Sequence, residues 1–189
     1  PDVLSASSQN DKIAWYKNDG NGNFSDQRVF TAIEEPNTVS SSDIDGDGDL
    51  DVLWSSFQGS IIGWYENFGN GNFGGAPQLI SPKGKGVKSI YSADLDGDND
   101  MDVLAGNFWN DKITWYQNYG NGNFGTEQII ISDADILSSF NFADLDGDGD
   151  LDVLSASWNG DKIAWYENDG NGNFGEQQVI TTDADRVSS

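Results

Sequence analysis

The sequence predicts an all-β protein, a β-propeller whose blades are four-stranded antiparallel sheets. A segment ending in Gly-Asn-Gly-Asn-Phe occurs four times, and its tryptophans stand at positions 15, 64, 115 and 165, at intervals of 49, 51 and 50 residues. A fixed period of this size indicates a solenoid, a propeller or an array. Between the turn-forming residues lie short runs that alternate apolar and polar side chains and favour β-branched and aromatic types, as strands do. Four such runs fit in each repeat, which is the content of one propeller blade.

Each strand of the repeat can be placed from these patterns. The first strand enters an acidic loop, as in residues 89–95, and the second leaves it, as in 152–157. The third and fourth strands, as in 162–168 and 176–181, flank the Asn-Gly pairs, which readily adopt the positive φ of a tight hairpin. The predicted domain bounds are a partial blade with strands two to four (1–36), three blades (37–86, 87–136 and 137–186), and the start of a further or closing strand (187–189).

Two ring sizes fit these bounds. Residues 1–4 align with 151–154 and Ser189 aligns with Ser139, so the sequence opens just after one acidic loop and stops just before another. One solution is a four-bladed ring that lacks a loop. The other, which we favour, is about four blades of a seven- or eight-bladed ring, completed by further blades of the same chain or by a second copy. We also expect the given sequence to be part of a longer or processed polypeptide, with any targeting segment outside it.

The composition excludes several classes of function. The chain has 32 acidic and 9 basic residues and a net charge of -23, so its surface repels nucleic acid and anionic membranes and attracts cations. It contains no Cys and no His, which removes disulfides, thiolate metal sites and the commonest general base. No apolar run approaches the roughly 18 residues of a membrane span.

The acidic loops place a carboxylate at every second position. Residues 43–51 read Asp-Ile-Asp-Gly-Asp-Gly-Asp-Leu-Asp, and close copies occupy 94–102 and 144–152. Two carboxylates about 4 Å apart repel by about 4 kcal/mol at an effective dielectric constant near 20, so such a loop should not close without a cation. We predict metal ligands from the side chains at positions 1, 3, 5 and 9 of each loop and from the main-chain carbonyl at position 7. In sequence order they are Asp43, Asp45, Asp47, Asp49 and Asp51; Asp94, Asp96, Asp98, Asp100 and Asp102; and Asp144, Asp146, Asp148, Asp150 and Asp152.

Calcium is the cation that this ligand pattern favours. Ca²⁺ takes six to eight oxygen ligands, whereas Zn²⁺ prefers Cys and His and Mg²⁺ keeps more of its waters. An EF-hand is rejected, because position 12 is Trp54, Ala105 or Ser155 instead of Glu and because strands flank the loop. We expect about one Ca²⁺ for each complete loop, with Asp2 as the position-9 remnant of a fourth. A merely solvated acidic turn is the alternative.

These motifs resemble a known family. The pattern DxDGDGDxDVL followed by WYENxGNGNF is similar to the FG-GAP/VCBS repeat of integrin α-subunit heads and of many secreted bacterial proteins, and the resemblance covers essentially the whole chain. It implies a β-propeller with Ca²⁺ in the loop between the first and second strands of a blade. It also implies adhesion or ligand binding outside the cell, while some members are lectins or carbohydrate-active enzymes.

A ligand would bind at the end of the blades opposite the acidic loops. The turns between the second and third strands vary there while the surrounding frame repeats, and they carry large aromatic residues that suit sugar stacking or partner anchoring. Packing onto the core is the alternative for these aromatics, and it is the role that we expect for the four repeating tryptophans. The lysines at 83, 85 and 88 are interpreted as a solvated loop. The candidate ligand contacts are Phe57, Phe108, Trp109 and Trp158.

The predicted function is a secreted or cell-surface, calcium-binding propeller that binds a glycan or an extracellular protein. It is expected not to be an enzyme, not to bind nucleic acid and not to insert into a membrane. Two alternatives stay open. The first is the propeller domain of a polysaccharide lyase or hydrolase, for which Glu34 and Glu35 are weak catalytic candidates because they break the repeat. The second is a structural spacer in a large surface protein.

Overall fold

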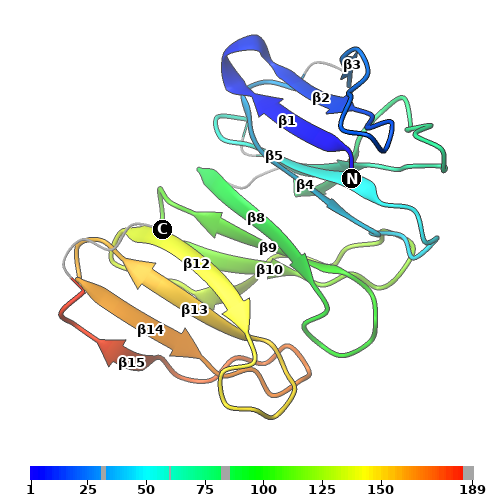
Figure 1. Ribbon diagram of the computed structural model, residues 1–189. Helices are drawn as coiled ribbons and strands as arrows, with labels where there is room; N and C mark the ends of the chain where they lie inside the picture. Colours follow the sequence, from blue (N-terminus) through cyan, green and yellow to red (C-terminus); the bar gives the residue numbers. More distant parts are fainter. Residues whose placement is uncertain (31–32, 60, 82–85, 185–189) are drawn as a thin grey trace. The chain divides into compact units, whose positions relative to one another are not determined.

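The computed structural model describes residues 1–30, 33–59, 61–81 and 86–184. Within these residues the chain forms four antiparallel sheets and one short 3-10 turn, η1 (Ser8–Asn10) (Figure 1). The lysines at 83 and 85 and the strand predicted to start at 187 lie outside the described residues. No helix of the described chain has the length and apolar character needed to cross a membrane.

In every sheet the strands lie side by side in chain order, so each sheet is a simple meander. The first sheet has three strands and the other three have four, which confirms the predicted all-β fold with propeller-like blades. Their bounds are β1 (Val3–Ser7), β2 (Lys12–Tyr16) and β3 (Arg28–Val29); β4 (Pro36–Ser42), β5 (Asp51–Ser56), β6 (Ile61–Tyr65) and β7 (Gln78–Ser81); β8 (Val87–Ala93), β9 (Asp102–Asn107), β10 (Lys112–Tyr116) and β11 (Gln128–Ile131); and β12 (Leu137–Ala143), β13 (Asp152–Ser157), β14 (Lys162–Tyr166) and β15 (Gln178–Thr181).

The third strand of a blade is shorter than the alternation of residues 162–168 predicts. It ends at Tyr166, and Asn168 instead makes an isolated bridge to Phe174 across the hairpin. The two glycines of this hairpin have φ values of +74° and +73°, so the expected positive φ is present. The hairpin is thereby held closed beyond the end of the regular strand.

The described chain divides into two compact units, each with its own core. The first comprises Pro1–Asp43 and Asp47–Ile90, and the second comprises Ile44–Gly46 and Tyr91–Ser189. The core of the first unit contains Ile13, Phe30, Ile33, Val52, Trp54 and Tyr65. The core of the second contains Leu95, Leu104, Ile113, Trp115, Phe140, Val153 and Tyr166, among others.

Two of the repeating tryptophans, Trp15 and Trp115, pack where adjacent blades meet. In the first unit the Trp15 ring meets Phe73 edge-on at 5.5 Å between centroids, and Gly71 of the same hairpin lies directly against the indole. In the second unit Gly172 lies against Trp115 in the same way. Each of these hairpins therefore rests on the tryptophan of the preceding blade, and only a residue without a side chain fits between them.

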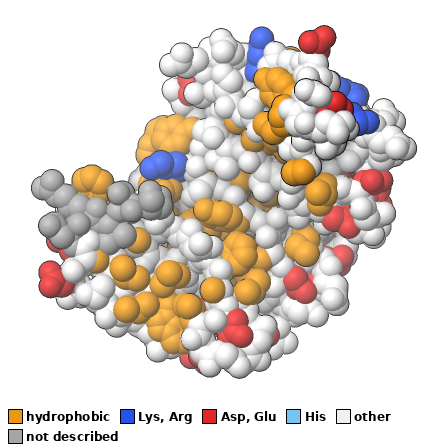
Figure 2. Space-filling view, in the orientation of Figure 1, with side chains coloured by type: hydrophobic (Ala, Val, Ile, Leu, Met, Phe, Trp, Pro, Cys, Tyr) orange, Lys and Arg blue, Asp and Glu red, His pale blue; other side chains and the backbone are white. Residues whose placement is uncertain are grey.

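Aromatic rings also join the first strands of neighbouring blades in the second unit. On the face that Figure 2 shows, apolar side chains gather over β12 and the strands beside it. Tyr91, at the β8 end of this unit, meets Phe140 and Phe142 of β12 edge-on, with centroids 5.1 and 5.8 Å apart. The first strands of the two blades are therefore in contact through these rings.

Candidate metal centre

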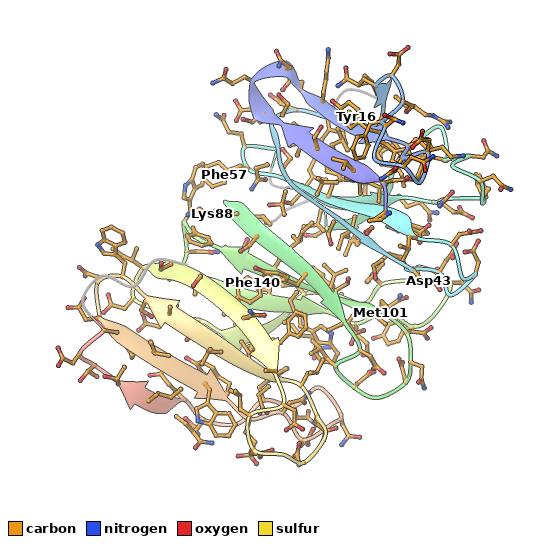
Figure 3. The ribbon with its side chains drawn as sticks, viewed as in Figure 1. Tyr16, Asp43, Phe57, Lys88, Met101 and Phe140 are labelled. Carbon is orange, nitrogen blue, oxygen red and sulfur yellow. The ribbon has the colours of Figure 1, made fainter. Side chains whose placement is uncertain are left out.

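Each acidic loop joins the first two strands of a blade and brings three of its aspartates together. The carboxylates at loop positions 1, 3 and 9 each offer an oxygen, and within a triad these oxygens lie within 4.8 Å of one another. Figure 3 labels Asp43 at the start of the first loop and Met101 near the end of the second. The triads are Asp43, Asp45 and Asp51; Asp94, Asp96 and Asp102; and Asp144, Asp146 and Asp152.

The position-9 aspartate of each loop is fully buried and fixed by main-chain amides. The carboxylate of Asp102 accepts hydrogen bonds from the amides of Leu95 (3.1 Å) and Asn118 (2.8 Å). Asp152 accepts the equivalent bonds from Leu145 and Asn168, both at 2.9 Å. This aspartate therefore ties the acidic loop to the end of the third strand of the same blade.

Asp2 occupies the corresponding place in the first sheet. Its carboxylate accepts hydrogen bonds from the amide of Asn18 (2.8 Å) and from the indole Nε1 of Trp15 (3.0 Å). The interpretation of Asp2 as a position-9 residue agrees with these bonds, although its side chain is exposed. Its place in a fourth metal site stays a prediction.

The position-1 aspartate shapes the reversal of the loop. Asp94 accepts hydrogen bonds from the amides of Gly97 (2.8 Å) and Asn99 (3.0 Å), and Asp144 accepts the same pair from Gly147 and Gly149. The residue at position 6 has a φ of +92° in the first loop, +71° at Asn99 and +101° in the third loop. The predicted reversal at position 6 is therefore present, and Asn99 adopts the left-handed conformation that asparagine tolerates.

Positions 5 and 7 lie outside the triads. Each position-5 carboxylate accepts a hydrogen bond from the amide two residues later, at 2.8 Å for Asp47, 2.9 Å for Asp98 and 2.9 Å for Asp148. The position-7 carboxylates lie instead against the first glycine of the hairpin in the same blade, as Asp100 does against Gly120. The structure thus groups positions 1, 3 and 9, and the ligand role of the other two positions stays a prediction.

The charges in these loops are crowded and partly removed from water. Burial raises the pKa of Asp102 to about 7, and the nearby Asp96 charge adds to this, against the lowering effect of the two amide hydrogen bonds. Burial and the Asp98 charge also raise the pKa of Asp96. The Oδ1 atom of Asp96 is buried and accepts no hydrogen bond from the described residues. An all-oxygen cluster with an unpartnered buried carboxylate oxygen suits a hard divalent cation, because the cation would cancel the charge that burial penalises.

One set of residues at this site was missed by the sequence analysis. The side-chain amide of Asn118 donates to the carbonyl of Ile44 in the loop of the preceding blade, at 2.8 Å, and Asn168 donates to the carbonyl of Leu95 at the same distance. These two asparagines are buried, and each links the acidic loop of one blade to the next blade. An Asn recurs two residues after each Trp-Tyr pair, at positions 18, 67, 118 and 168, and this pattern could have revealed them.

The four candidate ligand aromatics occupy two different environments. Phe57 lies at the opposite end of its blade from Asp43 (Figure 3) and is half-buried. Phe108 packs against the core of the second unit, which is the alternative role left open for these aromatics. Trp109 and Trp158 are 60% and 46% exposed, so these two present much of their indole surface to solvent.

The whole sequence matches one family of repeats. The FG-GAP-like repeat matches four overlapping stretches, residues 1–54, 43–105, 100–155 and 144–189, which together span the sequence. The chain belongs to the FG-GAP-like repeat family. No curated protein matches this FG-GAP-like chain.

Three solved structures share the fold. A lectin from Agrocybe aegerita, described as recognising non-reducing terminal N-acetylglucosamine, is 21% identical with a TM-score of 0.70, and the match covers 97% of this chain and 49% of the lectin. The Vibrio cholerae biofilm matrix protein Bap1 is 20% identical with a TM-score of 0.55, over 94% of this chain and 26% of that protein. BBS1N, solved in complex with ARL6DN, is 11% identical with a TM-score of 0.62, over 95% of this chain and 52% of that one. The FG-GAP-like chain thus spans about half the length of the lectin.

Proposed function

We propose that this FG-GAP-like chain is a calcium-stabilised binding module that acts outside the cell on a glycan or a protein partner and catalyses no reaction. The observation that carries the proposal is the recurrence of one carboxylate triad in three successive loops, each built around a fully buried aspartate. The ion would be held by positions 1, 3 and 9 and would supply positive charge that lets the loop close. The position-1 carboxylate and the turn at position 6 shape the loop around that place.

Calcium should act here as a structural ion. Extracellular modules bind Ca²⁺ with dissociation constants of about 10⁻⁴ to 10⁻³ M, which suits a protein exposed to the calcium levels outside cells. Likeness to a biofilm matrix protein supports the same location. Isothermal titration with CaCl₂ should give about one site per complete loop, and titration without heat or with a single site would contradict the proposal.

The exposed tryptophans support a binding role at the end of the blades opposite the acidic loops. Trp109 follows β9 and Trp158 follows β13, so both stand on second-to-third-strand turns of the second unit. Flat indole faces stack on sugar rings, and exposed aromatics anchor protein interfaces. The likeness to a lectin that recognises N-acetylglucosamine supports a glycan as the first ligand class to test.

A glycan array tests this proposal directly. Binding should be lost in the double variant Trp109→Ala and Trp158→Ala, while its melting temperature in calcium stays unchanged because both side chains lie on exposed turns. The matched control replaces Phe68 and Tyr119, which are 56% and 63% exposed on the hairpins at the acidic-loop end. Binding that survives the tryptophan substitutions but not the control substitutions would place the ligand at the acidic-loop end and contradict the proposal.

The two alternative functions give different outcomes in the same samples. A spacer would bind nothing on the array. An enzyme would release new unsaturated or reducing ends from polysaccharide, but glycosidases need two carboxylates flanking a cleft. The main-chain amide of Glu35 donates to the Asp11 carboxylate at 2.8 Å, and the main-chain carbonyl of Glu34 accepts a hydrogen bond from the Ser56 hydroxyl. Both glutamates therefore serve the connection between blades through their main chains.

A further inference from the structure

A groove of about 600 Å³ lies in the second unit between the outer strand of one blade and the last two strands of the next. One wall comes from β11 and the residues that follow it, and includes Ile131 and Asp133. The other wall comes from β14 and the segment that leads into β15, and includes Tyr166, Phe174 and Glu176. Both walls belong to the second unit, so this β11–β14 groove is a feature of that unit alone.

The first unit contains the same groove in a narrower form, with a volume of about 240 Å³. It lies between β3 and the next blade, and Tyr65 and Phe73 line it. These two residues are the repeat counterparts of the tyrosine and phenylalanine in the β11–β14 groove. The narrower groove is also lined by Arg28, a residue of β3.

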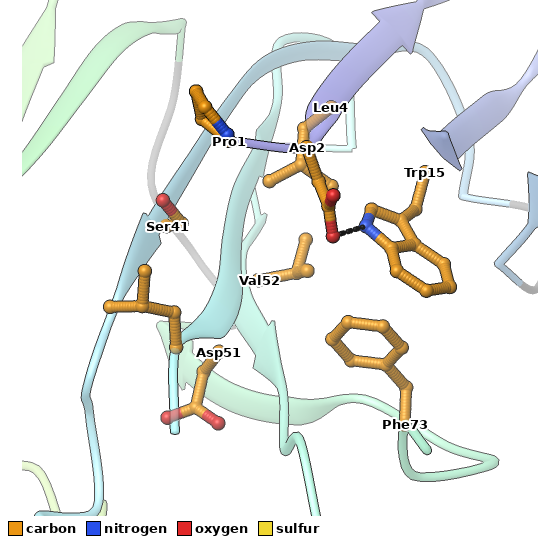
Figure 4. A pocket seen from close by; sticks show the side chains of 9 residues that line it. Pro1, Asp2, Leu4, Trp15, Ser41, Asp51, Val52 and Phe73 are labelled. Carbon is orange, nitrogen blue, oxygen red and sulfur yellow. Dashed lines mark hydrogen bonds between the residues drawn. The ribbon is translucent and has the colours of Figure 1, made fainter. Parts of the chain in front are cut away.

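The Arg28 side chain shows which kind of group this groove accepts. Its guanidinium carbon lies over the rings of Trp15 and Phe73, 5.9 and 5.8 Å from their centroids. Its Nη1 atom donates a hydrogen bond to the carbonyl of Gly71, in the hairpin of the next blade. Figure 4 shows the Trp15 indole bonded to Asp2, with Phe73 beside the ring. A guanidinium is therefore held here by two aromatic faces and a main-chain carbonyl, which are the partners that arginine prefers for stacking and hydrogen bonding.

The second unit repeats this surrounding structure with a different residue in the place of the arginine. Arg28 pairs with Trp15 across β2 and β3. In the second unit Gln128 pairs with Trp115 in the same register. The shorter, uncharged glutamine does not line the β11–β14 groove. The wider groove thus keeps the aromatic lining without the internal cation.

The charged side chains of the β11–β14 groove suit a cation from outside. Asp133 stands on one wall and Glu176 on the other, and both are exposed. Lys162 also lines the groove, and its Nζ atom donates to the side-chain oxygen of Gln177 at 3.2 Å on the same wall. Two carboxylates therefore face one ammonium group, in a chain whose net charge is -23. Such a site attracts cations, and a guanidinium pairs with carboxylates through more than one hydrogen bond.

We propose that the β11–β14 groove is a docking site for an arginine side chain of a protein partner. The incoming guanidinium lies against Phe174 as Arg28 lies against Phe73, and it pairs with the carboxylates on the two walls. The arginine of the partner thereby takes the role that an internal arginine has in the first unit. This site goes beyond the proposed calcium and glycan binding, because its residues lie outside the acidic loops and the turns that carry the exposed tryptophans.

A short peptide with one arginine tests the proposal. Acetyl-Gly-Gly-Arg-Gly-Gly-amide, titrated into the isotope-labelled whole protein in calcium, should shift the NMR signals of residues 130–133 and 174–177. The same peptide with citrulline has nearly the same shape without the charge, and it should give no such shifts. The double variant Asp133→Asn and Glu176→Gln should weaken binding by about two- to thirtyfold, as expected for the loss of two exposed ion pairs. The matched control, Glu167→Gln and Asp183→Asn, has the same net charge and exposed sites outside the groove, and it should bind normally.

The variant Gln128→Arg tests the comparison with the first unit. It should place an internal arginine against Phe174 and weaken binding of the arginine peptide without lowering the melting temperature, because Gln128 is exposed. Equal binding of the arginine and citrulline peptides overturns the proposal, as does the absence of shifts with either. Equal weakening in the groove variant and the matched control also overturns it, because the peptide would then respond only to net charge. Shifts confined to the acidic loops have the same consequence.

Discussion

Trp54 of β5 lies directly opposite Gly63 of β6, and its indole occupies the space that a side chain at position 63 would need. A Cβ at Gly63 would stand 2.8 Å from the Trp54 Cζ2 atom. At the same register the first and fourth sheets pair a serine with an alanine, Ser5 with Ala14 and Ser155 with Ala164. The second blade has therefore exchanged two small residues for one very large and one very small residue.

This exchange predicts a compensating pair of substitutions. Gly63→Ala should lower the free energy of unfolding by about 1–3 kcal/mol, because overpacking a filled core forces strain. Adding Trp54→Ser should recover part of this loss by restoring the serine–alanine pair of the first and fourth sheets. Urea unfolding in calcium measures both, and a double variant less stable than Gly63→Ala would contradict the explanation.

Removing calcium should destabilise the fold. An ion that binds only the folded loop would add about 2.7 kcal/mol at a hundredfold excess over its dissociation constant. EGTA should therefore lower the melting temperature, and Asp102→Asn should lower it in calcium and reduce the further effect of EGTA. Asp133→Asn, an exposed acid outside the loops, is the control and should leave the EGTA effect unchanged. A melting curve insensitive to EGTA would end the case for structural calcium.

Calcium binding should weaken as the pH falls through neutrality. In the ion-free protein, burial raises the pKa of Asp102 to about 7, well above the value of 3.8 expected for the unfolded chain. The protonated form is then favoured by folding, so stability without calcium should decrease as the pH rises from about 4 to about 7. Calcium must displace that proton, so the shift in melting temperature caused by calcium should be larger at about pH 8 than at about pH 5.5. An equal shift at both values would contradict the role assigned to Asp102.

Two hairpin glycines distinguish the cost of backbone strain from the cost of a steric clash with a neighbouring ring. Gly22 has a φ of +87° and no neighbouring atom within 4 Å of the place that a Cβ would take, whereas Gly172 has a φ of +73° and lies against Trp115. Gly22→Ala should therefore cost about 1 kcal/mol of backbone strain alone. Gly172→Ala should cost clearly more, because the methyl group meets the ring as well. Chemical denaturation of both variants in calcium tests the difference, and equal losses would mean that Trp115 does not limit the hairpin.

The sequence by itself determined what depends on neighbouring residues. Alternation of apolar and polar side chains located the strands, the period near 50 residues identified the blades, and the Asp spacing with a turn at position 6 located the acidic loops. These features are local, because strand alternation and turn conformation follow from each residue and its close neighbours.

Only the tertiary structure decided which of these residues meet across the blades. It buried the position-9 aspartates and left those at position 5 on their own loop amides, and it packed Phe108 on the core while exposing Trp109. It also brought the Asn118 side-chain amide to the Ile44 carbonyl, although the two residues are 74 positions apart in the chain. The physical reason is that burial and cross-blade contact depend on which sheet faces which, and a repeating sequence gives every blade the same pattern without showing which residues come together between blades.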